Sequence, residues 1–368
     1  MSVLDLLPTP CLLLDLPTLR RNLARMQAAV ARHPGLRLRP HLKTAKSAHV
    51  ADLAAPGKGP ITVSTLAEAR HFAAHGFRDQ LYAVGIVPAK LPIVAALNAA
   101  GAAVKVVTDD LDVARAIAAF EGPVTALIEL DVGEGRAGVT ATDPALTAIA
   151  TALGPRFAGL MSHSGHSYAG RSDARMAELA AEERASLLTA VARLAAAGMA
   201  PGIISAGASP TAMHGADFSG ITELRAGVYM FGDLLQAQLG VHPLEDVAVS
   251  VLTSVIGRYP GRGAVLVDAG ALALSKDRST EAAPRDWGFG RVLDRDGKAS
   301  LGDALVTRVH QEHGEVRAPG GLDLARLPVG TRLRIVPNHA CLTAAAHSNY
   351  QVLEDGALVA SWARVNGW

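Results

Sequence analysis

Apolar and polar positions follow two periods along the first two thirds of the chain. Residues 16–33 carry apolar side chains at helical spacing, which predicts an amphipathic helix. After it, short β-rich apolar runs alternate with Ala-rich helical segments. We expect strands within 36–41, 61–65, 80–86, 104–109, 124–132, 157–163, 202–207 and 223–231. Eight strands alternating with helices predict a (β/α)8 TIM barrel, because eight strands close such a barrel.

The pattern changes at about residue 246. The runs beyond it are β-branched and are separated by Gly, Pro and Asp turns, with no long helical pattern between them. They predict a C-terminal antiparallel β-domain. The CLLLD run at 11–15 is a further expected strand, which could pair with either half. We therefore expect a barrel domain over 14–245 and a β-domain formed by 1–13 and 246–368.

Composition narrows the classes of function. The 368 residues are 49% hydrophobic and 19% charged, with a net charge of +1, which argues against nucleic-acid or polybasic membrane binding. No apolar run reaches the ~18 residues that span a bilayer. The first residues lack the basic region of a signal peptide. The two cysteines, Cys11 and Cys341, lie far apart in the sequence, so we do not expect a disulfide framework. We expect a cytoplasmic location, because a reducing compartment suits free cysteines.

Two lysines follow the first expected barrel strand. Catalytic groups of barrels lie at the carboxyl ends of the strands, and RPHLKTAKS (39–47) occupies this place. On an extended chain Lys43 would point into the barrel beside His41, whereas we expect Lys46 to face outward on the next helix. A lysine partly desolvated at a barrel mouth can form a Schiff base. A solvated lysine at a strand–helix junction is the alternative.

Three motifs carry a family resemblance. PHLKT after the first strand, TLAEA after the second and DVGEGRAGV after the fifth resemble the fold-type III pyridoxal-phosphate enzymes, in the D-serine dehydratase and D-threonine aldolase family. The resemblance runs from PTPCLLLD to VNGW and implies a barrel plus β-domain, with Lys43 bearing the cofactor. It also implies a homodimer. The family usually has His where this chain has Ala45, which leaves the Schiff-base lysine in place.

Other cofactor contacts are expected at strand ends. Arg136, in the Gly-rich turn after the fifth strand, could reach the pyridine ring, where a cation disfavours protonation of the ring nitrogen. His163 and Tyr168 in SHSGHSY suit ring stacking or proton relay, and the resemblance favours His163. Phosphate needs backbone N–H groups at a turn or helix start. The candidates after the seventh and eighth strands are Gly207, Ser209, Thr211, Gly227 and Tyr229. A surface arginine, packed histidines and a core tyrosine are the structural alternatives.

A metal pair is expected in the C-terminal domain. His339 and Cys341 are one residue apart, so on a strand they would share a face and converge on one ion. Imidazole with thiolate is a zinc preference, and two protein ligands leave positions for water and substrate. PNHACLT also resembles the metal motif of the D-serine dehydratase branch. The aldolase branch has His-x-Asp there, which suits manganese or magnesium.

The resemblance implies a lyase that dehydrates and deaminates small D-3-hydroxy amino acids to a 2-oxo acid and ammonia. D-serine, D-threonine and 3-hydroxyaspartate are all candidate substrates. Lys43 would remove the Cα proton and the metal would assist loss of the hydroxyl group. The alternative is aldolase cleavage to glycine and an aldehyde. A racemase or a cofactor carrier is the further rival, but neither needs His339 and Cys341.

Overall fold

The computed structural model describes residues 3–368, which form two compact units. The barrel unit comprises Ala24–Gly227 and Gly367–Trp368. The sheet unit comprises Val228–Asn366 together with the chain up to Leu23. The domain limits expected from the sequence, 14 and 245, stay a prediction. The units group residues 228–245 with the second sheet, where Leu234 N–H donates to the Pro337 carbonyl at 3.0 Å.

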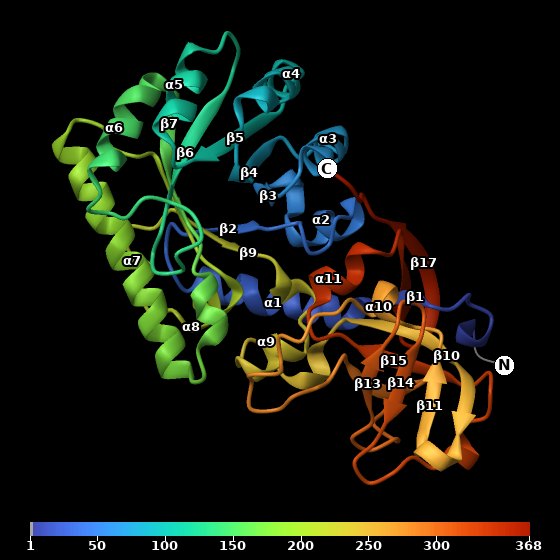
Figure 1. The fold of residues 1–368 in the computed structure, drawn as a ribbon. Helices are drawn as coiled ribbons and strands as arrows, with labels where there is room; N and C mark the ends of the chain where they lie inside the picture. Colours follow the sequence, from blue (N-terminus) through green and yellow to red (C-terminus); the bar gives the residue numbers. More distant parts are fainter. Residues whose placement is uncertain (1–2) are drawn as a thin grey trace. The chain divides into compact units, whose positions relative to one another are not determined.

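The barrel unit contains an eight-stranded parallel sheet in the order β2-β9-β8-β7-β6-β5-β4-β3 (Figure 1). An isolated parallel bridge between His41 and Thr62 joins its two ends, so the barrel closes. All eight expected strands are therefore confirmed. Their bounds are β2 Arg37–Pro40, β3 Ile61–Val63, β4 Asp79–Gly85, β5 Ala103–Thr108, β6 Thr125–Leu130, β7 Phe157–Ser162, β8 Ile203–Ala206 and β9 Glu223–Ala226. The last is shorter than expected, because Val228–Met230 forms a 3-10 helix.

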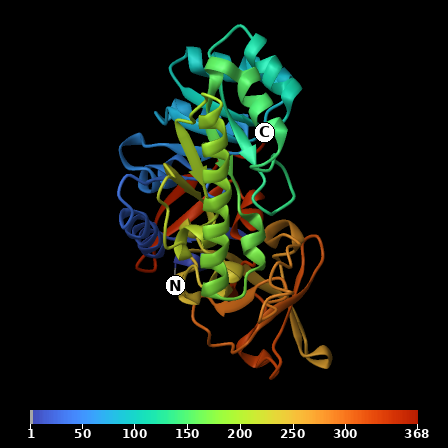
Figure 2. The ribbon, with the colours of Figure 1, turned by 90° about the vertical axis from the view of Figure 1, so that its left-hand side faces the viewer.

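Helices follow these strands in sequence. The expected first helix is α1, Leu16–Ala31. The others are α2 Ala48–Ala54, α3 Leu66–Ala74, α4 Leu91–Ala99, α5 Leu111–Ala119, α6 Pro144–Leu153, α7 Asp173–Ala196 and α8 Ser209–His214. α7 is the longest of the helices described and is seen along its length in Figure 2. None of the described helices is long and apolar enough to cross a membrane.

The TLAEA motif is a helix start. Thr65 Oγ1 accepts a hydrogen bond from Glu68 N–H at 3.0 Å, and Glu68 accepts from Ser64 N–H at 3.0 Å. These reciprocal bonds resemble a capping box and satisfy free N–H groups at the start of α3. The motif thereby fixes the turn between β3 and α3 and holds a buried carboxylate beside the barrel mouth.

The sheet unit is built on nine strands in the order β11-β14-β13-β12-β15-β10-β1-β16-β17. Their bounds are β1 Cys11–Asp15, β10 Val249–Tyr259, β11 Ala264–Val267, β12 Arg291–Asp294, β13 Leu305–Val309, β14 Gly314–Arg317, β15 Arg332–Val336, β16 Asn349–Glu354 and β17 Ala357–Ala363. All pairs are antiparallel except β1 with β16. The expected β-domain is confirmed, and β1 pairs within it.

Between residues 228 and 366 the α-helices are short: α9 Leu234–Gln238, α10 Ala271–Leu274 and α11 Ala340–Ala345. Its core includes a cluster of Leu4, Cys11, Leu13, Leu252 and Leu353. The burial of these side chains removes their apolar surface from water, at about 25 cal/mol per Å². The early strand β1 therefore contributes to the core of a unit made mostly of C-terminal residues.

Candidate active site

One hollow of the barrel unit, with a volume of about 280 Å³, gathers ionisable side chains from several strand ends. They follow or end β2, β6, β7 and β9, as expected for a barrel whose chemistry lies at the carboxyl ends of its strands. The ionisable side chains in its lining are His41, Lys43, Glu129, Arg136, His163 and Arg225. The structure thus brings together three predicted residues, Lys43, Arg136 and His163.

The lysine segment is a turn, not the extended chain that was expected. Lys46 N–H donates to the Leu42 carbonyl at 2.7 Å, and Lys43 N–H lies 3.4 Å from His41 Nδ1. The Lys43 side chain is exposed and lines the hollow. The prediction that Lys46 faces outward is wrong: its Nζ lies 3.2 Å from the buried Glu68 carboxylate. The charge of Lys46 is therefore neutralised locally, and Lys43 is the lysine that lines the hollow.

Both histidines of the hollow are neutral at pH 7. Burial, together with the charges of Lys43 and Arg136, lowers the pKa of His163 to about 3. Burial and the same lysine also hold the pKa of His41 well below its usual value. His163 Nδ1 lies 3.4 Å from the Gly207 carbonyl. A neutral imidazole in this position can pack against a ring or accept a proton.

Two guanidinium groups give the hollow its positive character. Arg136 is half exposed, with Nη2 3.4 Å from Glu129 Oε1. Arg225 is buried, donates to Ser205 Oγ at 2.9 Å and to the Ser162 carbonyl, and its Nε has no hydrogen-bond partner within residues 3–368. Burial raises the pKa of Glu129, although Arg136 and Arg225 oppose the rise. Three cationic side chains against one carboxylate suit an anionic ligand such as pyridoxal phosphate.

Tyr168 lies in a 3-10 helix, Gly165–Ala169, and does not line the hollow. Its ring centroid is 6.4 Å from that of His163, at a tilt of 52°. The structure therefore places Tyr168 behind His163 rather than in the lining.

The predicted phosphate segment after β8 is held by a carboxylate that the sequence analysis missed. Gly207 N–H donates to Glu183 Oε1 at 2.9 Å, and Ser162 Oγ donates to the same oxygen at 2.6 Å. Thr211 Oγ1 accepts from Ala208 N–H at 3.1 Å. The Gly207 N–H group is thus bonded within the protein. Ser209 opens α8 and is buried, as is Thr211.

Glycine is required at two places around this segment. Gly207 has φ +116°, and a Cβ on it would lie 2.8 Å from the Arg225 carbonyl oxygen. A Cβ on Gly227 would lie 2.8 Å from the His41 carbonyl oxygen. The ends of β8 and β9 therefore approach the hollow closely, Gly227 beside the lysine turn and Gly207 beside His163.

Tyr229 lies in the sheet unit, in the 3-10 helix that replaces the end of the last expected strand. It is buried, and burial raises the pKa of its hydroxyl well above the usual range.

The metal pair is not on a strand, so that part of the prediction is wrong. β15 ends at Val336, His339 is the N-cap residue of α11, and Cys341 lies in its first turn. The side chains of His339 and Cys341 nevertheless hydrogen-bond to one another. His339 and Cys341 lie at a helix start because the strand ends before Pro337 and Asn338, and an Ala-rich helix follows.

Two carboxylates surround His339. Its Nδ1 lies 3.5 Å from Asp277 Oδ2, and Asp233 Oδ2 accepts from Ala340 N–H at 3.0 Å. Burial opposes the charge on His339, but the bonds to Asp277 and Cys341 outweigh it and raise the pKa to about 11. Across the described chain, 3–368, no group of three or more His, Cys, Asp or Glu side chains has a metal-binding arrangement. The imidazole–thiol pair fits a borderline cation such as zinc with two protein ligands.

Comparisons with known proteins place both units in families. Residues 14–234 match the family "Alanine racemase, N-terminal domain", and residues 248–353 match the "Putative serine dehydratase domain". A D-threo-3-hydroxyaspartate dehydratase from Delftia sp. strain HT23 is 44% identical, over 98% of each chain. Its solved structure superposes with a TM-score of 0.95, covering 100% of both chains.

Two further proteins are similar along nearly the whole chain. An alanine racemase-like protein from Idiomarina loihiensis has a TM-score of 0.96 at 40% identity, covering 99% of this chain and 98% of its own. A D-threonine aldolase from Arthrobacter sp. is 31% identical over 96% of this chain and 91% of its own. This chain is therefore a lyase that belongs to the fold-type III pyridoxal-phosphate family, in the branch joining an alanine racemase-like barrel to a serine dehydratase domain.

Proposed function

We propose that this lyase dehydrates D-threo-3-hydroxyaspartate or a close D-3-hydroxy amino acid, giving a 2-oxo acid and ammonia. The observation that carries the proposal is the hydrogen-bonded pair of His339 and Cys341. A cysteine-to-alanine mutant of the Delftia dehydratase is described as metal-free. A cysteine in the metal pair of this chain supports the dehydratase branch over the aldolase branch, for which the sequence motif has an aspartate.

Lys43 is the proposed cofactor lysine and general base. When bound, pyridoxal phosphate supplies an electron sink that acidifies the Cα–H bond of the substrate. Lys43 Nζ takes the Cα proton, which its exposed position at the hollow allows. Arg136 would hold the cofactor on the side of its ring nitrogen and would disfavour protonation there. Neutral His163, whose ring contacts that of Tyr168, would pack against the cofactor ring.

The phosphate group is assigned to the two glycine segments. Gly207, Ser209 and Thr211 supply the start of α8, and Gly227 follows β9, with Tyr229 as a further donor. Because Gly207 N–H is bonded to Glu183, the role of Gly207 is to allow the close approach of the backbone. Buried Arg225 adds positive charge at the same hollow.

His339 and Cys341 are the proposed metal ligands. Zinc fits this pair best, with manganese or magnesium as the alternative, and it supplies a Lewis acid for the β-hydroxyl group. Asp277 orients the His339 ring through Nδ1, which leaves Nε2 for the ion. Cys341 binds as the thiolate, so its proton is released when the metal enters.

The aldolase reaction is the second candidate, because an aldolase is among the similar proteins. A product assay separates the two. The enzyme is incubated with D-threo-3-hydroxyaspartate, D-serine and D-threonine, and 2-oxo acid, ammonia, glycine and aldehyde are measured. Oxo acid and ammonia in equal amounts support dehydration. Glycine and aldehyde as the main products would replace the proposal with the aldolase reaction.

We further propose that the enzyme is a homodimer in the cytoplasm and takes a free D-amino acid as substrate. The homodimer rests on the family resemblance. Light scattering at micromolar concentration tests it, and a fully active monomer at high dilution would contradict it.

A further inference from the structure

A second hollow, of about 390 Å³, lies in the sheet unit. Its floor is one face of four neighbouring strands, β12, β15, β10 and β1. In the strand register Leu293 lies opposite Arg334, and Leu13 lies opposite Ser250. Since alternate residues of a strand share a face, Arg291 lies on the same face as Leu293. The floor therefore carries Leu13, Leu293 and the two arginines on one face, together with polar side chains such as Asp15 and Ser250.

Arg291 is a cation without an acceptor. Its Nε is buried and has no hydrogen-bond partner in the described chain, residues 3–368. Its guanidinium carbon lies 5.4 Å from the ring centroid of Trp287. Burial lowers the pKa of Arg291, and the charge of Arg285 lowers it further.

Arg334 also has hydrogen-bond donors without an acceptor in the described chain. Its Nε donates to the Arg295 carbonyl at 2.6 Å, and its terminal nitrogens have no hydrogen bond to any residue that the structure describes. Burial lowers its pKa, although Asp15 opposes this effect. Both arginines line the same hollow.

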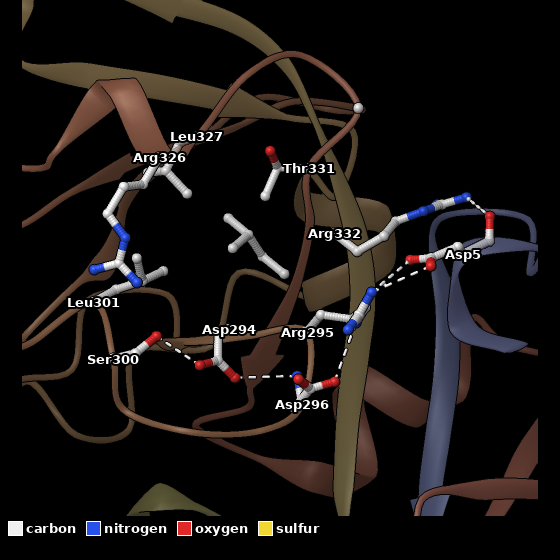
Figure 3. A pocket seen from close by; sticks show the side chains of 12 residues that line it. Asp5, Asp294, Arg295, Asp296, Ser300, Leu301, Arg326, Leu327, Thr331 and Arg332 are labelled. Carbon is white, nitrogen blue, oxygen red and sulfur yellow. Dashed lines mark hydrogen bonds and ion pairs between the residues drawn. The ribbon is translucent and has the colours of Figure 1, made fainter. Parts of the chain in front are cut away.

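Two other arginines of this unit are already paired. In the neighbouring hollow of Figure 3, Arg295 donates to both carboxylate oxygens of Asp5 at 3.2 Å and to Asp296 at 3.1 Å. Arg332 donates to Ser254 Oγ at 2.8 Å and to two carbonyls. These side chains hold the fold together. Arg291 and Arg334 differ because both line a cavity of ligand size and their terminal nitrogens make no hydrogen bond within residues 3–368.

We propose that this hollow binds a small organic acid through Arg291 and Arg334. The planar guanidinium fork matches a carboxylate, and small-molecule sites occupy about 300–1,000 Å³. Asp15, Glu245 and Asp296 also line the hollow, and Asp296 is already paired with Arg295. A ligand with one or two carboxylates therefore fits better than a polyphosphate. The site shares no lining residue with the hollow around Lys43.

Succinate is a suitable probe because it has no amino group and cannot react with the cofactor. Titration calorimetry of the holoenzyme should show saturable binding. Arg291→Gln should weaken it by at least about tenfold, as expected for losing a charge-assisted hydrogen bond. Arg334→Gln should do the same. The matched control is Arg326→Gln, which removes an exposed arginine of the neighbouring hollow and should leave binding unchanged.

The fluorescence of Trp287 provides an independent measurement of succinate binding. Succinate should change the tryptophan fluorescence, because Trp287 is beside Arg291. Trp287→Phe should abolish this change. Calorimetry should still detect binding to this variant, because Trp287 does not line the hollow. Lys43→Ala should keep the binding. The proposal is overturned if succinate shows no saturation up to about 50 mM, if folded Arg291→Gln and Arg334→Gln proteins bind it normally, or if Lys43→Ala abolishes binding.

Discussion

The buried carboxylate of Glu183 holds together three segments at the mouth of the barrel. It accepts hydrogen bonds from Ser162 Oγ at 2.6 Å and Gly207 N–H at 2.9 Å, and it lies 3.4 Å from Thr211 Oγ1. Glu183→Gln keeps the size of the side chain but removes its charge and replaces one acceptor oxygen by a donor NH2 group. The remaining oxygen can still accept from Ser162 and Gly207, but these two bonds lose the strength that the charge gives them.

The size of the effect follows from the bonds. A hydrogen bond to a charged group contributes about 1.5–3 kcal/mol, and a buried donor left unsatisfied costs about 1–3 kcal/mol. Glu183→Gln should therefore lower the free energy of unfolding by about 2–4 kcal/mol. Its neighbour on α7 is a matched control: Glu182 is 52% exposed and pairs with Arg175, a surface pair whose loss costs about 0–1 kcal/mol.

Urea titration of the apoprotein, followed by far-ultraviolet circular dichroism, measures both variants. The midpoint of Glu183→Gln should fall clearly below that of Glu182→Gln, and its cofactor affinity should fall as Gly207 is released. Equal midpoints for the two variants would show that the Glu183 bonds do not stabilise the barrel mouth, and the reasoning would be refuted.

Three further predictions concern the two sites. Lys43→Ala should abolish the visible absorbance of the bound cofactor and all turnover, whereas Lys46→Ala should keep the absorbance; the reverse result would exchange their roles. A chelator should remove dehydratase activity without releasing the cofactor, and zinc should restore this activity better than magnesium. Cys341→Asp should weaken zinc binding. Elemental analysis showing manganese or magnesium would contradict the zinc assignment. Because burial lowers the pKa of His163 from 6.5 to about 3, the unfolded apoprotein binds a proton that the folded one does not. Stability should therefore fall as the pH is lowered from 6.5 toward 3, and less steeply in His163→Gln, by urea midpoints at each pH; parallel curves would contradict the buried neutral state.

The barrel could be predicted because parallel strands covered on both faces are continuous apolar runs. In the sheet unit, β12 and β16 were not expected. Each carries charged or polar residues, such as Arg291 and Gln351, that interrupt the apolar pattern. Their pairing depends on neighbours distant in sequence, which local patterns do not contain.

The site could be predicted only where a motif marks it. Lys43, Arg136 and His163 follow strand ends and were found, whereas Arg225 and Glu129 lie inside strands, where no motif marks them. Glu183 was missed, but a signal was present: it occupies a position of the buried stripe of α7, between Ala180 and Leu187. A carboxylate on such a stripe indicates a buried acceptor. The predicted strand geometry of His339 and Cys341 was wrong, because a helix begins after His339 where a strand was expected to continue.

The position of β1 has a consequence for synthesis on the ribosome. Its Leu14 pairs with Val249 on one side and with Val352 on the other. The first partner emerges roughly 240 residues later, about 10–50 seconds at 5–20 residues per second. During that interval β1 has two open strand edges and an apolar face, while the complete barrel sequence is made beside it. A nascent chain of this protein therefore has a long window in which β1 is the segment most in need of protection, and variants that delay the end of translation should aggregate through it.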